Sequence, residues 1–402
     1  MKKTKMKKHL IYLLLFVLIP QLSGQAISTK KIKLLANESA QQYHFLKSQL
    51  GGANAFPRSY DKIKQKLVIS KSDWWCSGFY PGSLLYLYEL TGDTTLLHES
   101  QRLFVPLSKE QFNTSTHDLG FMMYCSFGNA YKLNPTSEYK QILINSAKSL
   151  AKRFNPTVGC IKSWESKPDD FLVIIDNMMN LEMLFWATKV TNDSTYAKIA
   201  ITHANTTMRN HYRSDYSCFH LVNYNPQNGT VQQKKTVQGY ADGSAWARGQ
   251  AWGLYGFMVM YRETHDRKYL EQAKKIAGFI LNHPRLPKDM IPYWDFDTPD
   301  IPNAPRDASA AAVMCSALLE LQQYVSGKLS VTYLQAAKTM FNSLSSNAYR
   351  VQRGEIGGFI LDHSTGDFPK KSEVDVPLSY ADYYYLESMK RLNKIISKQS
   401  IH

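Results

Sequence analysis

Residues 238–256 read Gln238-Gly-Tyr-Ala-Asp-Gly-Ser-Ala-Trp-Ala-Arg-Gly-Gln-Ala-Trp-Gly-Leu-Tyr-Gly256, and the rest of the chain is organised around them. The first part predicts a loop, because Gly239 and Gly243 are poor helix formers. Ser244 is a favourable helix N-cap, and the apolar periodicity that follows it predicts a helix that extends to about Arg262. The stretch is therefore a polar loop that leads directly into a helix.

Arg248 and Trp252 lie four residues apart, so they share one face of this helix. A guanidinium beside an indole suits a ligand that is both anionic and ring-shaped, such as an acidic sugar. Gln238 adds a hydrogen-bonding side chain in the preceding loop. The alternative is a core helix whose arginine is paired with an acid, since most tryptophans at helical spacing are packing residues. The stretch alone leaves both interpretations open.

Helical periodicity recurs along the whole chain, and signals for strands are few and short. The predicted strands lie near residues 219–223, 230–236 and 358–362. Many helices with short connections predict an all-α architecture. The predicted helices cover roughly residues 31–50, 80–91, 94–109, 119–132, 136–154, 172–190, 194–211, 245–263, 267–283, 307–325, 331–347 and 379–397.

A degenerate motif separates successive helices. Residues 88–93, 188–193 and 261–266 each contain a residue that ends one helix, followed by an aspartate able to cap the next. Such punctuation predicts stacked helical hairpins, and six hairpins that close on themselves form an (α/α)6 barrel, a double-layered toroid. No linker or shift in composition marks a second domain, so we expect residues 27–402 to form a single domain.

Residues 1–26 have the features of a secretory signal. Five lysines precede an apolar run over residues 10–20, which is too short to span a membrane, and Gly24-Gln-Ala26 offers a small-x-small cleavage site. We expect the mature protein to be exported to the periplasm or secreted, with no membrane attachment once the signal is removed.

The composition narrows the range of partners and cofactors. The formal net charge is +15, five of these charges being the lysines within residues 1–26, and a basic exported protein favours polyanionic partners. No basic helix or zinc spacing indicates nucleic-acid binding, so acidic polysaccharide is the better candidate. No spacing of metal ligands is present, and we expect neither a metal nor a cofactor. The five cysteines are odd in number and widely spaced, as expected of small buried side chains.

Asp118 and Asp176 are the strongest candidates for catalysis. Each is predicted at the start of a helix, in otherwise apolar surroundings. Burial disfavours the charged form of a carboxyl group, which keeps it protonated near neutral pH and able to act as an acid and then as a base. The alternative is that both are helix N-caps, a role for which aspartate is favoured.

Other polar and aromatic side chains have both a functional and an ordinary interpretation. His117 and His220 can hold a water or a sugar hydroxyl, although a lone histidine is more often a structural hydrogen-bonding group. Trp75 and Trp164 can stack on a sugar ring or pack in the core. Lys370 can contact an anionic substituent of a substrate or remain a solvated charge.

Taken together, the motifs resemble those of the unsaturated glucuronyl hydrolases, family 88 of the glycoside hydrolases. They occur in the family's order and cover nearly all of the mature chain. The matching segments are Trp75-Cys-Ser-Gly-Phe-Tyr-Pro-Gly-Ser-Leu84, Thr116-His-Asp-Leu-Gly-Phe121, Asp176-Asn-Met-Met-Asn180, Gln238-Gly-Tyr-Ala-Asp242, Ser244-Ala-Trp-Ala-Arg-Gly-Gln-Ala-Trp-Gly253, Pro302-Asn-Ala-Pro-Arg-Asp-Ala-Ser309 and Tyr380-Ala-Asp-Tyr-Tyr384.

The resemblance implies an (α/α)6 barrel that removes a 4,5-unsaturated uronic acid from the non-reducing end of oligosaccharides made by polysaccharide lyases. The reaction would begin with hydration of the C4=C5 double bond. Asp176 matches the residue that protonates C4 and takes a proton from the attacking water, and Asp118 matches the second carboxylate. Residues that match the sugar and water site are His117, His220, Gln238, Arg248 and Trp252, with Trp75 stacking on the substrate.

Lys370 stands where some relatives contact a sulfate group, so sulfated glycosaminoglycan fragments are the first expectation for the substrate. Two alternatives remain open on the sequence. One is an unsaturated rhamnogalacturonyl hydrolase acting on pectin fragments, which would share the barrel and the chemistry. The other is an exported protein that binds acidic sugars without catalysis.

Overall fold

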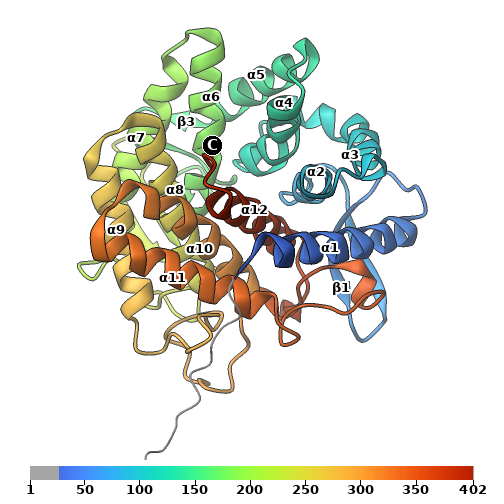
Figure 1. Cartoon of the computed structure of the whole chain (residues 1–402). Helices are drawn as coiled ribbons and strands as arrows, with labels where there is room; N and C mark the ends of the chain where they lie inside the picture. The colour runs from blue at the N-terminus through green and yellow to red at the C-terminus, as the bar shows by residue number, and fades with distance from the viewer. Residues whose placement is uncertain (1–26, 402) are drawn as a thin grey trace, which may run out of the picture.

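Outer and inner helices alternate along the chain in the computed structural model, which describes residues 27–401 (Figure 1). The predicted signal, residues 1–26, lies outside the described residues. The outer layer contains α1 (Thr29–Leu50), α3 (Thr94–Leu107), α5 (Ser137–Ala151), α7 (Thr195–Asn210), α9 (Arg267–Asn282) and α11 (Gly327–Leu344). The inner layer contains α2 (Phe79–Thr91), η2 (Gly120–Gly128) continuing into α4 (Asn129–Leu133), α6 (Leu181–Thr191), α8 (Ala247–Thr264), α10 (Ala308–Leu321) and α12 (Ser379–Ile396).

The inner helices form a closed ring. In order around the ring, α2 packs on η2, η2 on α6, α6 on α8, α8 on α10, α10 on α12, and α12 returns to α2. Outer helices α3, α7, α9 and α11 pack on the inner helices α2, α6, α8 and α10, respectively. The predicted (α/α)6 barrel is confirmed.

Side-chain polarity explains the two layers. All 14 residues of α10 are buried, because an inner helix has neighbours on every side. In α9 the buried residues are those of one stripe that includes Tyr269, Ala273, Ile276 and Ile280, and the opposite face carries lysines. An apolar stripe at this spacing is typical of a helix that covers a core on one side only.

The punctuation predicted at residues 88–93, 188–193 and 261–266 is confirmed at these three inner-to-outer turns. Gly92 ends α2 in the left-handed region (φ 78°), and the Asp93 side chain caps α3 by accepting the N–H of Thr95. His265 (φ 55°) and Asp266 repeat this arrangement between α8 and α9. These local signals set the hairpins of the barrel.

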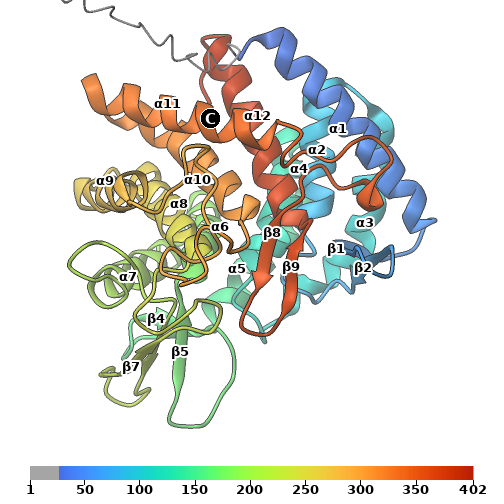
Figure 2. The same ribbon diagram turned by 90° about the horizontal axis from the view of Figure 1, so that it is seen from below.

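Short antiparallel strands gather at the end of the barrel away from the C-terminus (Figure 2). Strands β5, β6 and β7 form one sheet in that order, and the other strands form three hairpins. The strands are β1 (Phe56–Asp61), β2 (Lys66–Ser70), β3 (Phe154–Asn155), β4 (Cys160–Ile161), β5 (Phe171–Ile174), β6 (Leu221–Tyr224), β7 (Val231–Lys235), β8 (Ser364–Asp367) and β9 (Ser372–Val376).

The prediction of a helix over residues 172–190 is wrong in its first half. This segment begins as β5, continues as a 3₁₀ turn, η3 (Ile175–Asn180), and becomes helical only in α6. The β-branched run Val173-Ile-Ile175 is the reason, because Val173 pairs with Val222 of the distant strand β6. The short 3₁₀ segments elsewhere are η1 (Ser108–Phe112), η4 (Gln322–Tyr324) and η5 (Ile356–Gly358).

Two of the three predicted strands are confirmed as β6 and β7, whereas the strand expected near residues 358–362 is wrong. That stretch follows η5 and makes only an isolated bridge between Leu361 and Arg350. The hairpin of β1 and β2 was not predicted.

No helix within residues 27–401 is both long and apolar enough to cross a membrane. All five cysteines are free thiols, and all but Cys125 are buried.

Candidate active site

A cavity of about 580 Å³ opens at the end of the barrel where the strands gather. Eight of the nine side chains predicted for the site line it, although they come from segments far apart in the sequence. These eight residues are Trp75, His117, Asp118, Asp176, His220, Gln238, Arg248 and Lys370. The barrel brings them together because the loops that precede its inner helices all end at this mouth.

Trp252 is the exception. Its side chain is fully buried, and its ring packs against Phe121 (5.1 Å between centroids) and Tyr384 (5.6 Å) behind the cavity wall. The expectation that Trp252 lines the sugar site is therefore corrected: it is a core residue that supports the wall. Trp164, the other stacking candidate, does line the cavity.

Asp118 and Asp176 precede two neighbouring inner helices that approach each other closely. A Cβ atom added to Gly120 would lie 2.5 Å from the Cα of Asn180, so only glycine permits this approach. The Asn180 side chain also accepts the backbone N–H of Phe121 at 3.0 Å. This junction of η2 and η3 holds the two carboxyl-bearing turns side by side.

The local structure excludes the alternative in which the two aspartates are helix N-caps. The capping positions of η2 and η3 are Leu119 and Ile174, and no side chain caps either segment. Asp118 accepts a hydrogen bond from Thr116 Oγ1 at 3.1 Å. Asp176 Oδ2 is buried and has no hydrogen-bond partner within residues 27–401. Both carboxyl groups are therefore available to a molecule in the cavity.

Burial raises the pKa of both carboxyl groups to about 7. At Asp176, electrostatic interactions with the His117 ring and the Arg248 guanidinium work against this rise, and the nearby carboxyl of Asp118 adds to it. At Asp118, hydrogen bonds from Thr116 and Asn180 oppose it. A carboxyl group with a pKa near 7 can hold a proton and release it at neutral pH, which is the property that acid–base catalysis requires.

The two histidines of the cavity have opposite tautomers. His117 Nδ1 lies 2.8 Å from the carbonyl oxygen of Ser163, which can only accept, so Nδ1 carries the proton and Nε2 is a lone-pair acceptor. His220 Nδ1 receives the backbone N–H groups of Val237 (3.1 Å) and Gln238 (3.2 Å), so its proton is on Nε2. Burial lowers the pKa of His117 to about 4 and that of His220 to about 3, which keeps both rings neutral.

Each histidine faces one carboxyl group. His117 Nε2 lies 3.1 Å from Asp118 Oδ1, although this contact does not have hydrogen-bond geometry. His220 Nε2 lies 3.7 Å from Asp176 Oδ2. A neutral acceptor beside Asp118 and a neutral donor beside Asp176 present opposite environments to the two carboxyl groups.

Arg248 is part of the wall and is itself firmly anchored. Its guanidinium pairs with Asp307 at 2.8 Å and donates to the carbonyl oxygens of Thr365 and Gly366, both at 2.5 Å. The indole beneath it belongs to Trp246 (4.6 Å) and not to Trp252. The interpretation that this arginine is paired with an acid is confirmed. The hydrogen bonds to Thr365 and Gly366 fix β8 to the start of α8.

The hairpin of β8 and β9 closes one side of the cavity. Gln238 Nε2 donates to Gly366 O at 3.0 Å, so this predicted site residue holds the hairpin. Lys370 Nζ pairs with Asp367 Oδ2 at 3.0 Å, and its side chain is 66% exposed at the rim. Lys370 is thus a rim residue, far less enclosed than the carboxyl groups.

Sequence reasoning missed a group of residues that also line the cavity. Arg58 on β1 pairs through Nε with Glu373 Oε1 at 2.6 Å and lies over the Trp74 ring at 4.5 Å. All three line the cavity, as does Tyr380. The pair Trp74-Trp75 was a usable signal, but Arg58 gave none, because its position depends on a hairpin that was not recognised.

The described residues contain no group of three or more metal-ligating side chains suited to holding an ion.

The chain is similar to several known proteins along most of its length. The model of the glycosyl hydrolase family 88 matches residues 52–393. The unsaturated glucuronyl hydrolase of Formosa agariphila is 45% identical over 402 residues, which span 97% of this chain and 100% of that protein. Its counterpart in Bacillus sp. strain GL1 is 33% identical, over 84% of this chain and 91% of that protein.

A solved structure described as an unsaturated glucuronyl hydrolase specific for heparin is 44% identical to this chain. It superposes with a TM-score of 0.88, over 93% of this chain and 100% of that one. A family model that spans most of the chain, together with relatives above 30% identity that also match most of it, establishes the relationship. The chain therefore belongs to glycosyl hydrolase family 88.

Proposed function

We propose that this chain removes a 4,5-unsaturated uronic acid from the non-reducing end of glycosaminoglycan oligosaccharides. It is an unsaturated glucuronyl hydrolase, as its family and its relatives support. One observation carries the mechanism: Asp176 Oδ2 is buried in the cavity wall without a hydrogen-bond partner, and the pKa of this carboxyl group is raised to about 7.

The proposed reaction is hydration of the C4=C5 double bond. The protonated carboxyl group of Asp176 gives its proton to C4, and the resulting carboxylate then takes a proton from the water whose oxygen bonds to C5. The Asp176 carboxyl group is therefore protonated again at the end of the hydration. The hemiketal formed at C5 opens and the glycosidic oxygen leaves with the aglycone, so that water is the only other reactant. The Nε2–H of His220, 3.7 Å from Asp176 Oδ2, is suited to stabilising the transient carboxylate.

Asp118 is proposed to support this step without exchanging protons with the sugar. Its carboxyl group raises the pKa of Asp176 through repulsion between like charges, so it helps to keep the acid protonated. Trp75 and Trp164 offer flat faces to a sugar ring at the cavity wall.

We further propose that sulfated, heparin-type fragments are the preferred substrates. The structural relative with 44% identity is described as specific for heparin. At the rim, Arg58 uses only Nε in its ion pair with Glu373, and its terminal nitrogens make no hydrogen bond within residues 27–401. A planar guanidinium with free donors is suited to a sulfate group on the sugar that follows the uronic acid.

The test is the loss of ultraviolet absorbance of the double bond when the protein is mixed with lyase-made disaccharides. The panel contains sulfated and unsulfated heparin, chondroitin, hyaluronan and pectin products. We expect consumption of glycosaminoglycan products with heparin-type members ranked first. Action on pectin fragments alone would favour the rhamnogalacturonyl alternative, and binding without consumption would favour the sugar-binding protein.

Substitution of Arg58 tests the proposed contact with a sulfate group. Arg58→Gln should raise KM for sulfated disaccharides about tenfold, the equivalent of roughly 1.4 kcal/mol, and leave unsulfated ones nearly unchanged. Lys66→Gln is the matched control, because Lys66 is an exposed residue of the same hairpin and is not at the cavity. Equal effects on sulfated and unsulfated substrates would contradict a sulfate-binding role for Arg58.

We also propose that the protein is exported to the periplasm and that residues 27–402 form one catalytic domain. The proposal rests on the basic, apolar and small-residue pattern of residues 1–26. Fractionation of cells that express the full chain, with N-terminal sequencing of the product, tests it. We expect a periplasmic protein that begins at Ile27, and a cytoplasmic protein that begins at Met1 would refute export.

A further inference from the structure

The barrel has a second cavity, of about 690 Å³, at the end opposite the candidate active site. The two cavities share no lining residue. The active site is built at the N-terminal ends of the inner helices, whereas most residues that line the second cavity lie further along those helices. On α12, for example, Tyr380 lines the first cavity and Lys394 lines the second. A helix rises about 1.5 Å per residue, so these residues are roughly 20 Å apart along the axis.

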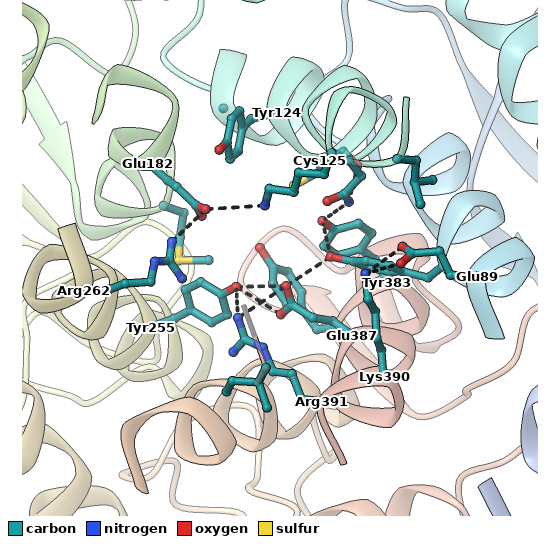
Figure 3. Close-up of a pocket in the computed structure, with 18 of the residues that line it drawn as sticks. Glu89, Tyr124, Cys125, Glu182, Tyr255, Arg262, Tyr383, Glu387, Lys390 and Arg391 are labelled. Atoms are coloured by element: carbon teal, nitrogen blue, oxygen red, sulfur yellow. Dashed lines mark hydrogen bonds and ion pairs between the residues drawn. The ribbon is translucent and has the colours of Figure 1, made fainter. Parts of the chain in front are cut away.

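Figure 1 looks onto this second mouth, with the C-terminal segment near its centre. Ile401 in that segment is one of the lining residues. Charged and tyrosine side chains from α2, α6, α8 and α12 converge on the cavity (Figure 3). This is an unusual wall for the interior of a barrel, because buried charges are costly unless they are paired.

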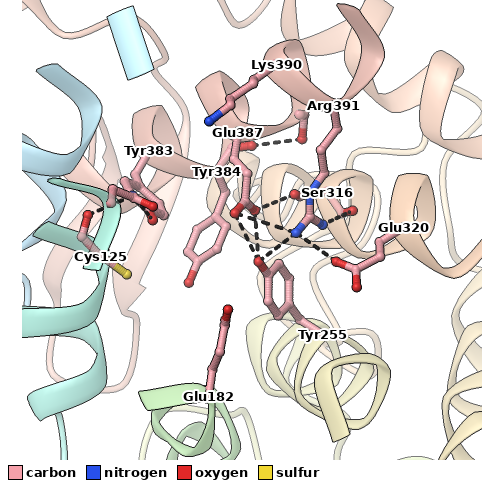
Figure 4. A network of polar contacts seen from close by, with 12 residues as sticks. Cys125, Glu182, Tyr255, Ser316, Glu320, Tyr383, Tyr384, Glu387, Lys390 and Arg391 are labelled. Carbon is pink, nitrogen blue, oxygen red and sulfur yellow. Dashed lines mark hydrogen bonds and ion pairs between the residues drawn. The ribbon is translucent and has the colours of Figure 1, made fainter. Parts of the chain in front are cut away.

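Buried ion pairs account for the two arginines of the cavity, Arg262 (Figure 3) and Arg391 (Figure 4). Arg391 pairs with Glu320 at 2.8 Å and lies 3.7 Å from Glu387. Arg262 pairs with Glu182 at 2.7 Å and with Glu320 at 3.1 Å. This network connects α6, α8, α10 and α12 and explains why the arginines are present. It is structural and needs no ligand.

Ion pairs do not account for all the lysines that line the second cavity. Lys394, which is half-buried, forms no ion pair with any residue from 27 to 401. Lys132 lies 3.8 Å from Glu182, a carboxylate that Arg262 already holds at 2.7 Å. The cavity is lined by six basic and four acidic side chains, namely Lys132, Lys189, Arg262, Lys390, Arg391 and Lys394 with Glu89, Glu182, Glu263 and Glu387.

The electrostatic environment of Lys394 reflects this excess of positive charge. Its pKa is lowered, first by burial and then by repulsion from Lys390 and other cations that include Lys132 and Arg391. Only Glu89 acts in the opposite direction among the principal charges. A negatively charged group placed in the cavity would relieve this repulsion.

A tyrosine hydroxyl supplies a second, independent observation. Tyr384 is only 2% exposed, and its hydroxyl has no hydrogen-bond partner among the described residues although it lines the cavity. Figure 4 shows this hydroxyl directed toward the space between Tyr255 and Glu182. The neighbouring hydroxyl of Tyr255 is already bonded to Glu387 at 3.0 Å. The Tyr384 hydroxyl is therefore a donor at the cavity wall that a ligand can use.

We propose that this cavity binds a small oxyanion, a carboxylate or sulfate carried by a molecule of monosaccharide size. Lys394 and Lys132 supply the charge, and the Tyr384 hydroxyl supplies a directed hydrogen bond. The volume lies within the range of about 300–1,000 Å³ that is usual for small-molecule sites. The Lys132 ammonium lies over the Tyr124 ring at 5.1 Å, a contact that holds this lysine at the cavity. The proposal does not depend on the chemistry of the other mouth.

Calorimetric titration of the full-length mature protein tests the site with three probes: sodium sulfate, sodium glucuronate and neutral glucose. We expect at least one anion to bind and glucose not to bind. Sulfate and glucuronate binding together would show that the oxyanion suffices, whereas glucuronate alone would show that the sugar ring is also required. Lys394→Gln and Tyr384→Phe should each weaken anion binding about tenfold or more.

Matched controls remove the same groups elsewhere. Lys328→Gln removes an exposed lysine of the outer helix α11, and Tyr333→Phe removes the hydroxyl of a buried tyrosine of that helix. Both controls should bind the anion normally, and all four variants should retain turnover of the unsaturated disaccharide as evidence of folding. The proposal is overturned if no anion binds at millimolar concentration. It is also overturned if binding is unchanged in Lys394→Gln and Tyr384→Phe, because the anion would then occupy another site.

Discussion

His220 presents its Nε2 atom to Asp176 Oδ2 at a distance of 3.7 Å. Two backbone N–H groups that donate to His220 Nδ1 fix the tautomer, so the atom facing the carboxyl group carries a proton. The contact is too long for a hydrogen bond in this state. It leaves the carboxyl group free to react and still places a donor close to the charge that forms when the group loses its proton.

Replacement of Asp176 is the first test of this arrangement. Asp176→Asn should reduce kcat by about 10²–10⁴-fold, because the amide cannot deliver and recover a proton, while the disaccharide still binds. Turnover is followed by the ultraviolet absorbance of the double bond, and binding is measured by calorimetry. Asp169→Asn is the control, since Asp169 is exposed and outside the cavity. Near-normal turnover in Asp176→Asn would remove this residue from the mechanism.

The dependence of activity on pH follows from the raised pKa values of Asp118 and Asp176. Both carboxyl groups have a pKa of about 7, so the protonated acid that the reaction needs is present below pH 7 and is lost above it. We expect kcat/KM to fall as the pH rises from 6 to 8, with a midpoint at about 7. An alkaline limb centred well above pH 8 would show that neither carboxyl group supplies the reacting proton.

The same shift has a consequence for stability. A carboxyl group whose pKa is higher in the folded state than in the unfolded chain favours folding at low pH, and this contribution is lost as pH rises toward 7. Asp176→Asn should therefore raise the free energy of unfolding at pH 8 by on the order of 4 kcal/mol and change it little at pH 4. Denaturant unfolding at the two pH values measures this. A variant that is less stable at pH 8 would contradict the buried-carboxyl interpretation.

Gly120 controls the approach of the two carboxyl-bearing turns. Gly120→Ala places a methyl group 2.5 Å from the Asn180 Cα, so the turns must move apart. We expect a loss of stability of about 1–3 kcal/mol and a fall in kcat that is larger than any change in KM. Gly278→Ala on α9 is the control, because nothing lies within 4 Å of an added Cβ there. It should be neutral or stabilising by roughly 0.5–1 kcal/mol.

Arg248 is expected to contribute to stability as well as to the cavity wall. Arg248→Met leaves the buried Asp307 without its partner, which should cost about 3–5 kcal/mol in the free energy of unfolding. The double variant Arg248→Met/Asp307→Asn should recover part of this loss, because no buried charge then remains. Thermal and denaturant unfolding report the change. If Arg248→Met altered KM and left the free energy of unfolding unchanged, the ion pair would not stabilise the fold.

Several features of the protein could be read from the sequence because they depend on residues close together in the chain. Gly92-Asp93 and His265-Asp266 mark helix ends through local backbone and capping preferences, and these boundaries were predicted correctly. The periodicity of the helices then led to the barrel. Asp118 and Asp176 were recognised in the same way, as carboxyl groups at the starts of helices in apolar surroundings.

Other features depend on contacts between distant residues. Val173 forms a strand because Val222 lies opposite, and Arg58 reaches the cavity because the hairpin of β1 and β2 brings it to Glu373. Helical spacing placed Trp252 on the same face as Arg248, but the barrel buries Trp252 and sets Trp246 against the guanidinium. Spacing along one helix gives the face of a side chain but does not say what packs against that face.

The sequence by itself therefore determined the barrel, the family resemblance and the two carboxyl groups, because helix periodicity, capping and motif order are local properties of the chain. Only the tertiary structure decided which tautomers His117 and His220 adopt, how strongly burial raises the pKa of Asp176, and that a second charged cavity lies at the far mouth. Hydrogen-bond partners, desolvation and cavities arise when segments distant in sequence pack together.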